Sequence, residues 1–304
     1  MKKLLLIIGI IGGMSLHAVS QQLPLYSQYM FNRLLLNPAV TGSHDDIPIR
    51  LTARQQWVGI DKAPSTQIIS GHLRLKNETM GLGGIIFADR FGPESRIGLQ
   101  ANYAYILPVF GENGRLAFGL SFQVFQYQMD YTQLTAIEAD DPALMYSNEN
   151  AWLPESDFGL YLYGDKYFAG MSANQMIELP MNVGGQEVEM NTLVRHYHVM
   201  GGYRFDTGEY FSLEPSLLAK GTFDTPYQVD VNLKAIYRDN YWLGVSYRTS
   251  GDVIAMLGLE FNDIIFGFAY DYSTSKLSHY QDGTFELMLG YNISRKGAGS
   301  QSFF

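Results

Sequence analysis

Hydrophobic and polar residues alternate along many short segments of this chain. In one of them Val231, Leu233, Ala235 and Tyr237 alternate with Asp230, Asn232 and Lys234. The segments 116–124 and 285–292 repeat the pattern. Successive side chains of a β-strand point to opposite faces, so each segment predicts a strand with one apolar and one polar face. Both a soluble β-sandwich and a β-barrel in lipid contain such strands.

The alternation predicts an all-β protein of roughly fourteen strands. We expect strands near 49–57, 66–75, 80–89, 96–107, 115–127, 156–164, 166–174, 193–205, 210–220, 227–238, 241–249, 252–261, 264–273 and 284–293. Turns rich in Asn, Asp and Gly separate several of them, because these residues accept the positive φ angles that hairpins need. An even number of antiparallel strands closes into a barrel without exposed edges and leaves both ends on one side of a membrane. The longer connections, near 130–155 and 175–191, then lie outside.

Aromatic residues favour a transmembrane antiparallel β-barrel over a soluble sandwich. They make up 14% of the chain, and the 21 Tyr residues outnumber the 18 Phe. Strand-end tyrosines such as Tyr103, Tyr127, Tyr203 and Tyr241 suit the aromatic girdles at the two membrane–water interfaces. The mean hydropathy is −0.07, and no long apolar run follows residue 20. The sequence therefore excludes a bundle of membrane-spanning helices.

The first twenty residues have the form of a secretory signal peptide. Two lysines precede an apolar core over 4–11, and Ala18-Val19-Ser20 is a plausible cleavage site before Gln21. The apolar core is too short to span a bilayer, although a retained anchor is the alternative. We expect export beyond the inner membrane of a bacterium.

Composition and motifs argue against enzymatic, metal and nucleic-acid functions. The chain has 0 Cys, which excludes disulfides and thiolate chemistry, and its net charge of −9 argues against nucleic acid. His196 and His198 share a strand face but lack a third metal ligand, so we expect interior polar groups. The acidic residues 138, 140, 141 and 149, with Glu155 and Asp157, lack calcium-loop spacing and predict a solvated outer loop. We assign no catalytic residue, no metal and no cofactor.

Residues 21–46 do not alternate and form a separate unit in our interpretation. Ser27 is placed to cap a short helix that ends before Asn37-Pro38, since proline disfavours helix in the preceding residue. The apolar residues of this stretch need a packing partner, and the barrel lumen or its periplasmic mouth supplies one. We therefore predict a signal peptide (1–20), a plug or periplasmic segment (21–46), a barrel (47–293) and a C-terminal tail (294–304).

Three short blocks of residues form a signature near the start of the expected mature chain. The first block is Gln28, Tyr29, Met30, Phe31 and Asn32, followed by Asn37, Pro38, Ala39 and Gly42. The second block is Arg54, Gln55, Gln56 and Trp57, and the third is Ala63, Pro64, Ser65 and Thr66. Together the three blocks resemble the PorP/SprF family, outer-membrane proteins of the type IX secretion system of Bacteroidetes, and the closing stretch 285–293 also resembles the family's final strand. Asn-Pro-Ala by itself also occurs in FadL-like barrels.

The resemblance implies an outer-membrane component that helps secreted proteins such as adhesins leave the cell or stay attached to its surface, in some cases for gliding motility. It implies as partners other type IX secretion subunits, a secreted cargo with a C-terminal sorting domain, and outer-membrane lipid. The family is not known for an active site, so the matching residues are expected to serve plugging and partner contact. A FadL-like transporter of hydrophobic small molecules is the alternative, and a purely structural barrel is a third possibility.

The first strand offers a physical interpretation of the second block. Arg50, Thr52, Arg54 and Gln56 share one face of it. A charge facing lipid at the membrane midplane costs roughly 2–4 kcal/mol, so this face is expected to point into the lumen. Arg50 and Arg54 then meet carboxylates such as Glu214, Asp230 or Glu286 across the lumen. They either neutralise a packed polar interior or hold the N-terminal segment or a partner's tail.

Overall fold

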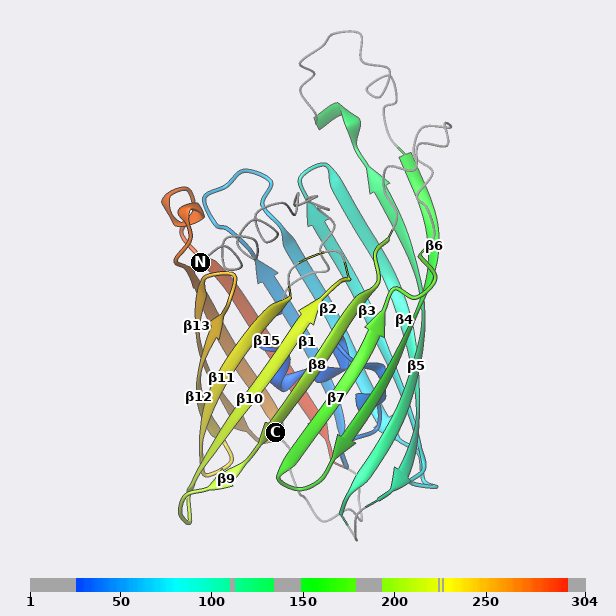
Figure 1. The fold of residues 1–304 in the computed structure, drawn as a ribbon, viewed down its shortest axis with the longest axis vertical. Helices are drawn as coiled ribbons and strands as arrows, with labels where there is room; N and C mark the ends of the chain where they lie inside the picture. The colour runs from blue at the N-terminus through cyan, green and yellow to red at the C-terminus, as the bar shows by residue number, and fades with distance from the viewer. Residues whose placement is uncertain are drawn as a thin grey trace, which may run out of the picture.

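Fourteen antiparallel strands close into a barrel in the computed structural model (Figure 1). The structure describes residues 26–109, 113–133, 149–178, 193–223, 225 and 227–294, so the predicted signal peptide and almost all of the predicted C-terminal tail lie outside the described residues. The strands are β1 (Ile47–Gln55), β2 (Ser65–Arg74), β3 (Met80–Phe91), β4 (Glu94–Pro108), β5 (Arg115–Met129), β6 (Glu149–Tyr163), β7 (Tyr167–Asn174), β8 (His196–Tyr203), β10 (Phe211–Gly221), β11 (Gln228–Tyr237), β12 (Tyr241–Arg248), β13 (Asp252–Phe261), β14 (Ile264–Ser273) and β15 (Thr284–Ile293). The predicted fold is confirmed.

Each strand pairs with its neighbours along the chain, and the last strand pairs with the first. In the β1–β15 ladder, Ile47 lies opposite Ile293 and Arg54 lies opposite Glu286. The additional two-residue strand β9 (Phe205–Asp206), which the alternation did not predict, pairs with the start of β10. Closure leaves no unpaired edge, which a barrel in lipid requires because lipid offers no hydrogen-bonding partners.

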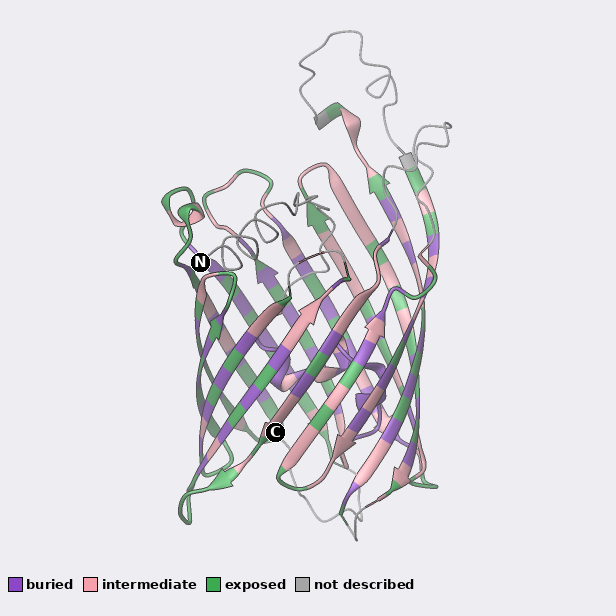
Figure 2. Ribbon diagram, viewed as in Figure 1, coloured by how far each residue is buried: buried purple, intermediate pink, exposed green. Residues whose placement is uncertain are grey.

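Burial along the strands is the reverse of that in a soluble protein. On β11, polar Asp230, Asn232 and Lys234 are buried, whereas Val231 and Leu233 are 51% and 44% exposed. Figure 2 shows the same alternation of buried and exposed positions around the wall. An apolar outer face over a polar interior is the arrangement of a membrane barrel. Among the described residues, no helix is long and apolar enough to cross a membrane.

The two ends of the barrel differ in their connections. One end, where β1 starts and β15 ends, carries the connections 75–79, 109–114, 164–166, 204–210, 238–240 and 262–263. We call it the short-turn end. The other end carries the short turns 92–93 and 249–251 and the longer connections 56–64, 130–148, 175–195, 222–227 and 274–283, and we call it the long-loop end. The connection 274–283 contains the 3-10 turn η6 (Lys276–His279), and another 3-10 turn, η4 (Tyr131–Gln133), follows β5.

Residues 26–43, the N-terminal segment, lie inside the ring of strands (Figure 1, dark blue). They form three 3-10 turns, η1 (Tyr29–Phe31), η2 (Arg33–Leu35) and η3 (Pro38–Val40). The predicted helix capped by Ser27 is wrong, because Gln28 precedes η1 and no side chain caps it. Asn37 does cap η3, accepting a hydrogen bond from the Ala39 N–H.

Other predictions need correction at strand ends. β1 ends at Gln55, so Gln56 and Trp57 belong to the following connection, where Trp57 has a φ of 46°. Tyr127 was expected in an aromatic girdle, but it is 2% exposed and packs inside the barrel with Phe125 and Leu153. The first error arises because β-strand alternation does not say where pairing stops. The second arises because Tyr127 shares the inward face of β5 with Ala117, Gly119 and Ser121.

Candidate functional site in the barrel lumen

The start of the N-terminal segment is held by charged groups on three adjacent strands. The carboxylate of Glu286 accepts hydrogen bonds from the backbone N–H groups of Ser27 and Gln28, at 2.8 and 2.9 Å. The Ser27 hydroxyl donates to Asp271 at 2.7 Å. Arg54 completes the cluster, with ion pairs to Glu286 at 2.9 Å and Asp271 at 2.8 Å. Arg54 therefore faces the lumen, as expected, and neutralises both carboxylates that hold the segment.

The middle of the segment bonds to opposite sides of the wall. The Tyr29 hydroxyl accepts a hydrogen bond from the Asn232 amide of β11 at 2.5 Å. Burial raises the pKa of Tyr29, so its phenol stays neutral. Asn32 donates to the Ser70 hydroxyl of β2 at 2.8 Å. These two bonds connect η1 to strands that lie far apart in the ring.

Arg33 forms the third attachment. Its guanidinium pairs with Glu214 of β10 at 3.0 Å and stacks 3.7 Å from the centre of the Phe168 ring. Lys234 of β11 pairs with the same Glu214 carboxylate at 3.1 Å. Glu214 therefore meets Arg33 and Lys234 rather than Arg50 or Arg54. No carboxylate within ion-pair distance of Arg50 occurs among the described residues, and Arg50 bonds to the Ile49 carbonyl at 3.1 Å.

The Asn-Pro-Ala stretch packs directly against the wall formed by β5, β6 and β7. The Asn37 amide donates to the backbone carbonyls of Leu160 at 2.9 Å and Met171 at 3.2 Å, on adjacent strands. A Cβ atom on Gly119 would lie 2.1 Å from the Ala39 nitrogen, and one on Gly159 would lie 1.9 Å from Asn37 Oδ1. The two glycines therefore allow the segment to approach the strands at backbone distance.

The end of the segment attaches to β2. The Gly42 N–H donates to His72 Nδ1 at 3.0 Å, and Arg74 donates to the carbonyls of Gly42 and Ser43 at 2.8 and 2.9 Å. Gly42 has a φ of 76°, a conformation that favours glycine. A Cβ on the facing Gly81 would lie 2.3 Å from the Thr41 carbonyl oxygen. The segment thus leaves the lumen through a contact that larger residues would obstruct.

The structure brings most of the family-signature residues together. Buried in the lumen are Gln28, Tyr29, Met30, Asn32, Asn37, Pro38, Ala39, Gly42, Arg54 and Thr66. Gln56 and Pro64 are buried just beyond the strands, whereas Gln55 is exposed on the outer face. Trp57 is half-buried and lies edge-on to Phe91, 6.5 Å between ring centres. Their roles in plugging and partner contact remain predictions.

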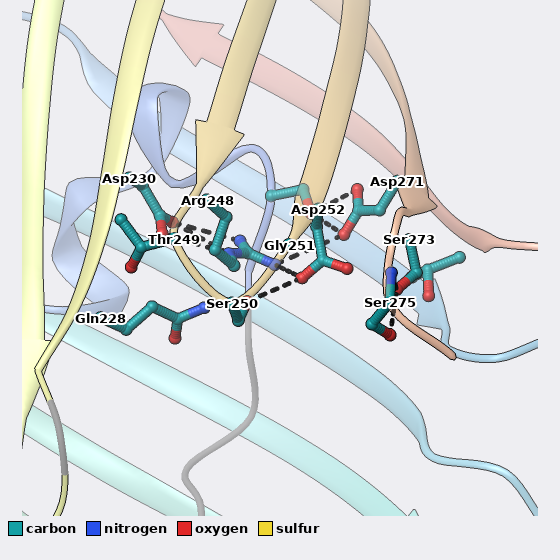
Figure 3. Close-up of polar contacts among 12 residues, drawn as sticks. Gln228, Asp230, Arg248, Thr249, Ser250, Gly251, Asp252, Asp271, Ser273 and Ser275 are labelled. Carbon is teal, nitrogen blue, oxygen red and sulfur yellow. Dashed lines mark hydrogen bonds and ion pairs between the residues drawn. The ribbon is translucent and has the colours of Figure 1, made fainter. Parts of the chain in front are cut away.

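A chain of ion pairs lines the wall from β10 to β1. Arg248 pairs with Asp230 at 3.2 Å and Asp271 at 3.7 Å, and lies 3.9 Å from Asp252 (Figure 3). Lys220 extends the chain to β10, 3.4 Å from Asp230. Asp271 and Arg248 were missed as site residues, although each falls on the polar face of its predicted strand. The alternation identifies that face but not which charges meet across it.

The predicted acidic outer loop is wrong for two of its members. Glu155 and Asp157 lie on β6 and are 1% and 6% exposed. β6 begins at Glu149, seven positions before the expected start, and so includes Glu155, whereas Asp157 already fell within the expected strand 156–164; both side chains lie on its inward face. Residues 138, 140 and 141 lie outside the described residues.

The two histidines behave as polar groups of the interior. His198 is buried, and its Nδ1 lies 3.0 Å from the Asn174 side-chain oxygen. His196 Nδ1 lies 2.7 Å from the Val194 carbonyl. Within the described ranges, no group of three or more His, Asp or Glu side chains is placed to hold a metal ion.

Comparison with protein families identifies the chain. The family model described as "Type IX secretion system membrane protein PorP/SprF" matches residues 18–291. The chain belongs to the PorP/SprF family. It is therefore a membrane component of the type IX secretion system and lies in the outer membrane, and the family is not one of enzymes. Family membership also implies association with other components of that system.

Solved structures with the same fold are transport barrels. The toluene transporter TbuX of Ralstonia pickettii is 10% identical, with 86% of this chain and 92% of that chain covered and a TM-score of 0.53. The CymD monoaromatic hydrocarbon channel is 15% identical, with 93% and 95% covered and a TM-score of 0.51. At these identities the likeness shows the fold alone. A comparison with curated proteins finds no match.

Proposed function

We propose that this barrel serves the type IX secretion system by binding proteins, so that secreted proteins such as adhesins are exported or held at the cell surface. The observation that carries the proposal is the attachment of the N-terminal segment. It bonds to β1, β2, β6, β7, β10, β11, β14 and β15, around most of the ring. A lumen crossed by so many fixed contacts suits a rigid docking platform better than a water-filled channel.

The two ends of the barrel suit different partners. In the proposed orientation the long-loop end faces the outside and contacts the secreted cargo with its C-terminal sorting domain. The short-turn end then faces the periplasm and the other secretion subunits. The signature residues of the N-terminal segment act indirectly, because they hold the wall in one shape. A contribution to gliding motility in a Bacteroidetes cell is part of the same proposal.

Co-purification tests the proposal. The tagged full chain is isolated from outer membranes in mild detergent, and its companions are identified and quantified by mass spectrometry. We expect secretion subunits together with a large secreted protein that carries a C-terminal sorting domain. An equally abundant tagged barrel of unrelated function, prepared in parallel, controls for random capture. Recovery of the barrel without protein partners contradicts the proposal.

A second function, transport of hydrophobic small molecules, is favoured by one observation. A luminal cavity is walled partly by apolar side chains, among them Leu35, Ile68 and Phe125. Uptake of a labelled alkane or fatty acid by cells with and without the chain tests it. Uptake that depends on the chain, from a barrel that purifies without protein partners, selects the transporter.

A further inference from the structure

The outer face of the barrel carries a group of aromatic side chains at the short-turn end of β10, β11 and β12. Phe211 lies opposite Tyr237 in the β10–β11 ladder, and Tyr237 lies opposite Tyr241 in the β11–β12 ladder. All three side chains are exposed, and the centres of neighbouring rings lie 5.7 and 6.4 Å apart. Amphipathic aromatic rings at the ends of lipid-facing strands mark the boundary between hydrocarbon and headgroups. We call these three residues, together with the exposed Tyr210, the aromatic patch.

Arg238 holds its guanidinium over this patch. The guanidinium carbon lies 5.0 Å from the centre of the Tyr210 ring and 5.4 Å from the centre of the Tyr237 ring. Arg238 and Asp239 have φ angles of 52° and 57°, as in a type I′ hairpin turn. The Arg238 N–H donates to the Tyr210 carbonyl at 2.8 Å, which fixes the turn to the start of β10. The cation is therefore held in place at the membrane boundary before any ligand binds.

The charge of Arg238 has no counter-ion in the described part of the chain. Asp239, its neighbour in sequence, pairs with Arg204 instead. The exposed Glu209 precedes Tyr210, yet it is not within ion-pair distance of Arg238, and no other described carboxylate is. The exposed Lys166, at the same end of the barrel, does have a carboxylate partner 2.8 Å away. Arg238 thus offers an unpaired positive charge on an exposed side chain.

The surroundings of Arg238 indicate which anion reaches it. The outer face that continues from the patch is apolar, with Leu233 of β11 and Leu243 of β12 exposed, so lipid tails cover it in a membrane. An anion at the end of such a face is carried by the lipid itself, as the phosphate of its headgroup. A guanidinium stacked on aromatic rings keeps the N–H donors of its edge free, and their fork matches two phosphate oxygens.

We propose that Arg238 and the aromatic patch bind the phosphate of an anionic glycerophospholipid in the leaflet at the short-turn end. The guanidinium donates to the phosphate oxygens, and the acyl chains pack along the outer face of β11, on Ala235 and Leu233. The site specifies the lipid partner expected for this barrel. It depends only on the barrel lying in a membrane, and not on the protein partners proposed above.

Native mass spectrometry of the purified full chain in detergent tests the site. The probes are dihexanoylphosphatidylglycerol and dihexanoylglycerol, which have the same acyl chains but differ in the charged phosphate. We expect one phosphatidylglycerol per barrel, bound at least about fivefold more tightly than dihexanoylglycerol, since one cation at a membrane surface contributes to that extent. Equal affinity for the two lipids, or no binding of either, overturns the proposal even if a variant fails to fold.

Variants locate the binding. Arg238→Gln removes the charge and is expected to lower the affinity for phosphatidylglycerol at least about fivefold, with the affinity for dihexanoylglycerol unchanged. Lys76→Gln is the matched control, because Lys76 is an exposed cation in another turn at the short-turn end, and binding should stay unchanged. Unchanged phosphatidylglycerol affinity in Arg238→Gln overturns the site. If that variant also loses a protein that co-purifies with the unaltered barrel, Arg238 contacts a protein and not a lipid.

Discussion

Charged side chains form ion pairs in one half of the lumen, whereas the carboxylates of the other half bond to neutral groups. In the paired half, formed by β10 to β15 and β1, a continuous chain of ion pairs connects Lys220, Asp230, Arg248, Asp271 and Arg54. In the open half, formed by β3 to β8, the carboxylates of Asp89, Glu155 and Asp157 accept from hydroxyl and backbone donors beside a cavity.

This difference determines how much the charges of each half contribute to the stability of the fold. A buried ion pair is unfavourable to break, because the remaining charge stays buried without a partner. The paired half therefore fixes the N-terminal segment and the strand arrangement. A buried carboxylate that meets only neutral donors lacks this attraction. The open half is thus less constrained by ion pairs than the paired half.

Arg54→Ala should have the largest effect, since it leaves Glu286 buried without a cation and leaves Asp271 with only Arg248, 3.7 Å away. We expect a loss of about 3–5 kcal/mol of unfolding free energy, measured by guanidinium unfolding in detergent, and trypsin cleavage after Arg33 in the folded barrel. The matched variant in the open half is Arg96→Ala, which removes a 3.8 Å pair to Glu94 and the charge that lies opposite Asp89 in the β3–β4 ladder, and should cost about 1 kcal/mol. Equal losses of unfolding free energy in the two variants, or unchanged resistance to trypsin at Arg33 in Arg54→Ala, contradict the division into halves.

Gly119→Ala should separate the N-terminal segment from the wall without changing any charge. The new methyl group meets the Ala39 backbone at 2.1 Å, so η3 or β5 has to move. Overpacking of this kind costs about 1–3 kcal/mol, and protease sensitivity of the segment should rise. Gly201→Ala is the control, because its Cβ would have an ordinary contact of 3.5 Å to the Phe168 carbonyl. A resistant Gly119→Ala barrel excludes tight packing of η3.

Glu155→Gln and Glu286→Gln should change stability in opposite directions. The first removes a carboxylate that has no basic partner and should be neutral or stabilising by about 1 kcal/mol. The second weakens the attachment of Ser27 and leaves Arg54 with one carboxylate, so unfolding should occur at lower denaturant. Parallel unfolding curves of the two variants measure the contrast. Destabilisation of both by the same amount shows that Glu155 has a compensating partner.

Lys166→Ala should have the smallest effect. Lys166 lies 2.8 Å from Asp206 at the short-turn end, outside the lumen, and both side chains are exposed. The hydrogen bond from Lys166 lowers the pKa of Asp206. In the variant this pKa should rise toward its ordinary value, followed by NMR titration of the carboxyl group, with the unfolding curve unchanged. A clear shift of the unfolding curve to lower denaturant shows that ion pairs outside the lumen also stabilise the fold.

The sequence predicts the wall of the barrel well because the wall follows local rules. Two-residue alternation depends on which face meets lipid, and turns depend on nearby Gly, Asn and Asp, so thirteen of the fourteen strands could be placed within three residues at each end, and the start of β6 was missed by seven. Arg54 could be turned inward on the same ground. The first turns of the N-terminal segment could not be predicted, since tertiary bonds from Glu286 and Asp271 replace the expected cap at Ser27.

The contents of the lumen depend on which strands face each other across it. Arg248 and Asp271 sit on polar faces that the sequence predicts, but the closure of the ring decides that they meet. Glu155 was misplaced because β6 extends beyond the point where its alternation is clear. The division into a paired and an open half depends on which strands become neighbours in the closed ring. It therefore cannot be predicted from any single strand.

The bonds from Glu286 to Ser27 and Gln28 connect residues 259 and 258 positions apart in the chain. Glu286 lies on the last strand, the one that closes the ring with β1. Contacts so distant in sequence form late, because a long loop has to close first. The N-terminal segment is synthesised early, yet it has to wait for the final strand before its first residues are held. A barrel that lacks β15 loses the carboxylate that holds Ser27 and Gln28, so the start of the segment is the last part of the lumen to be fixed.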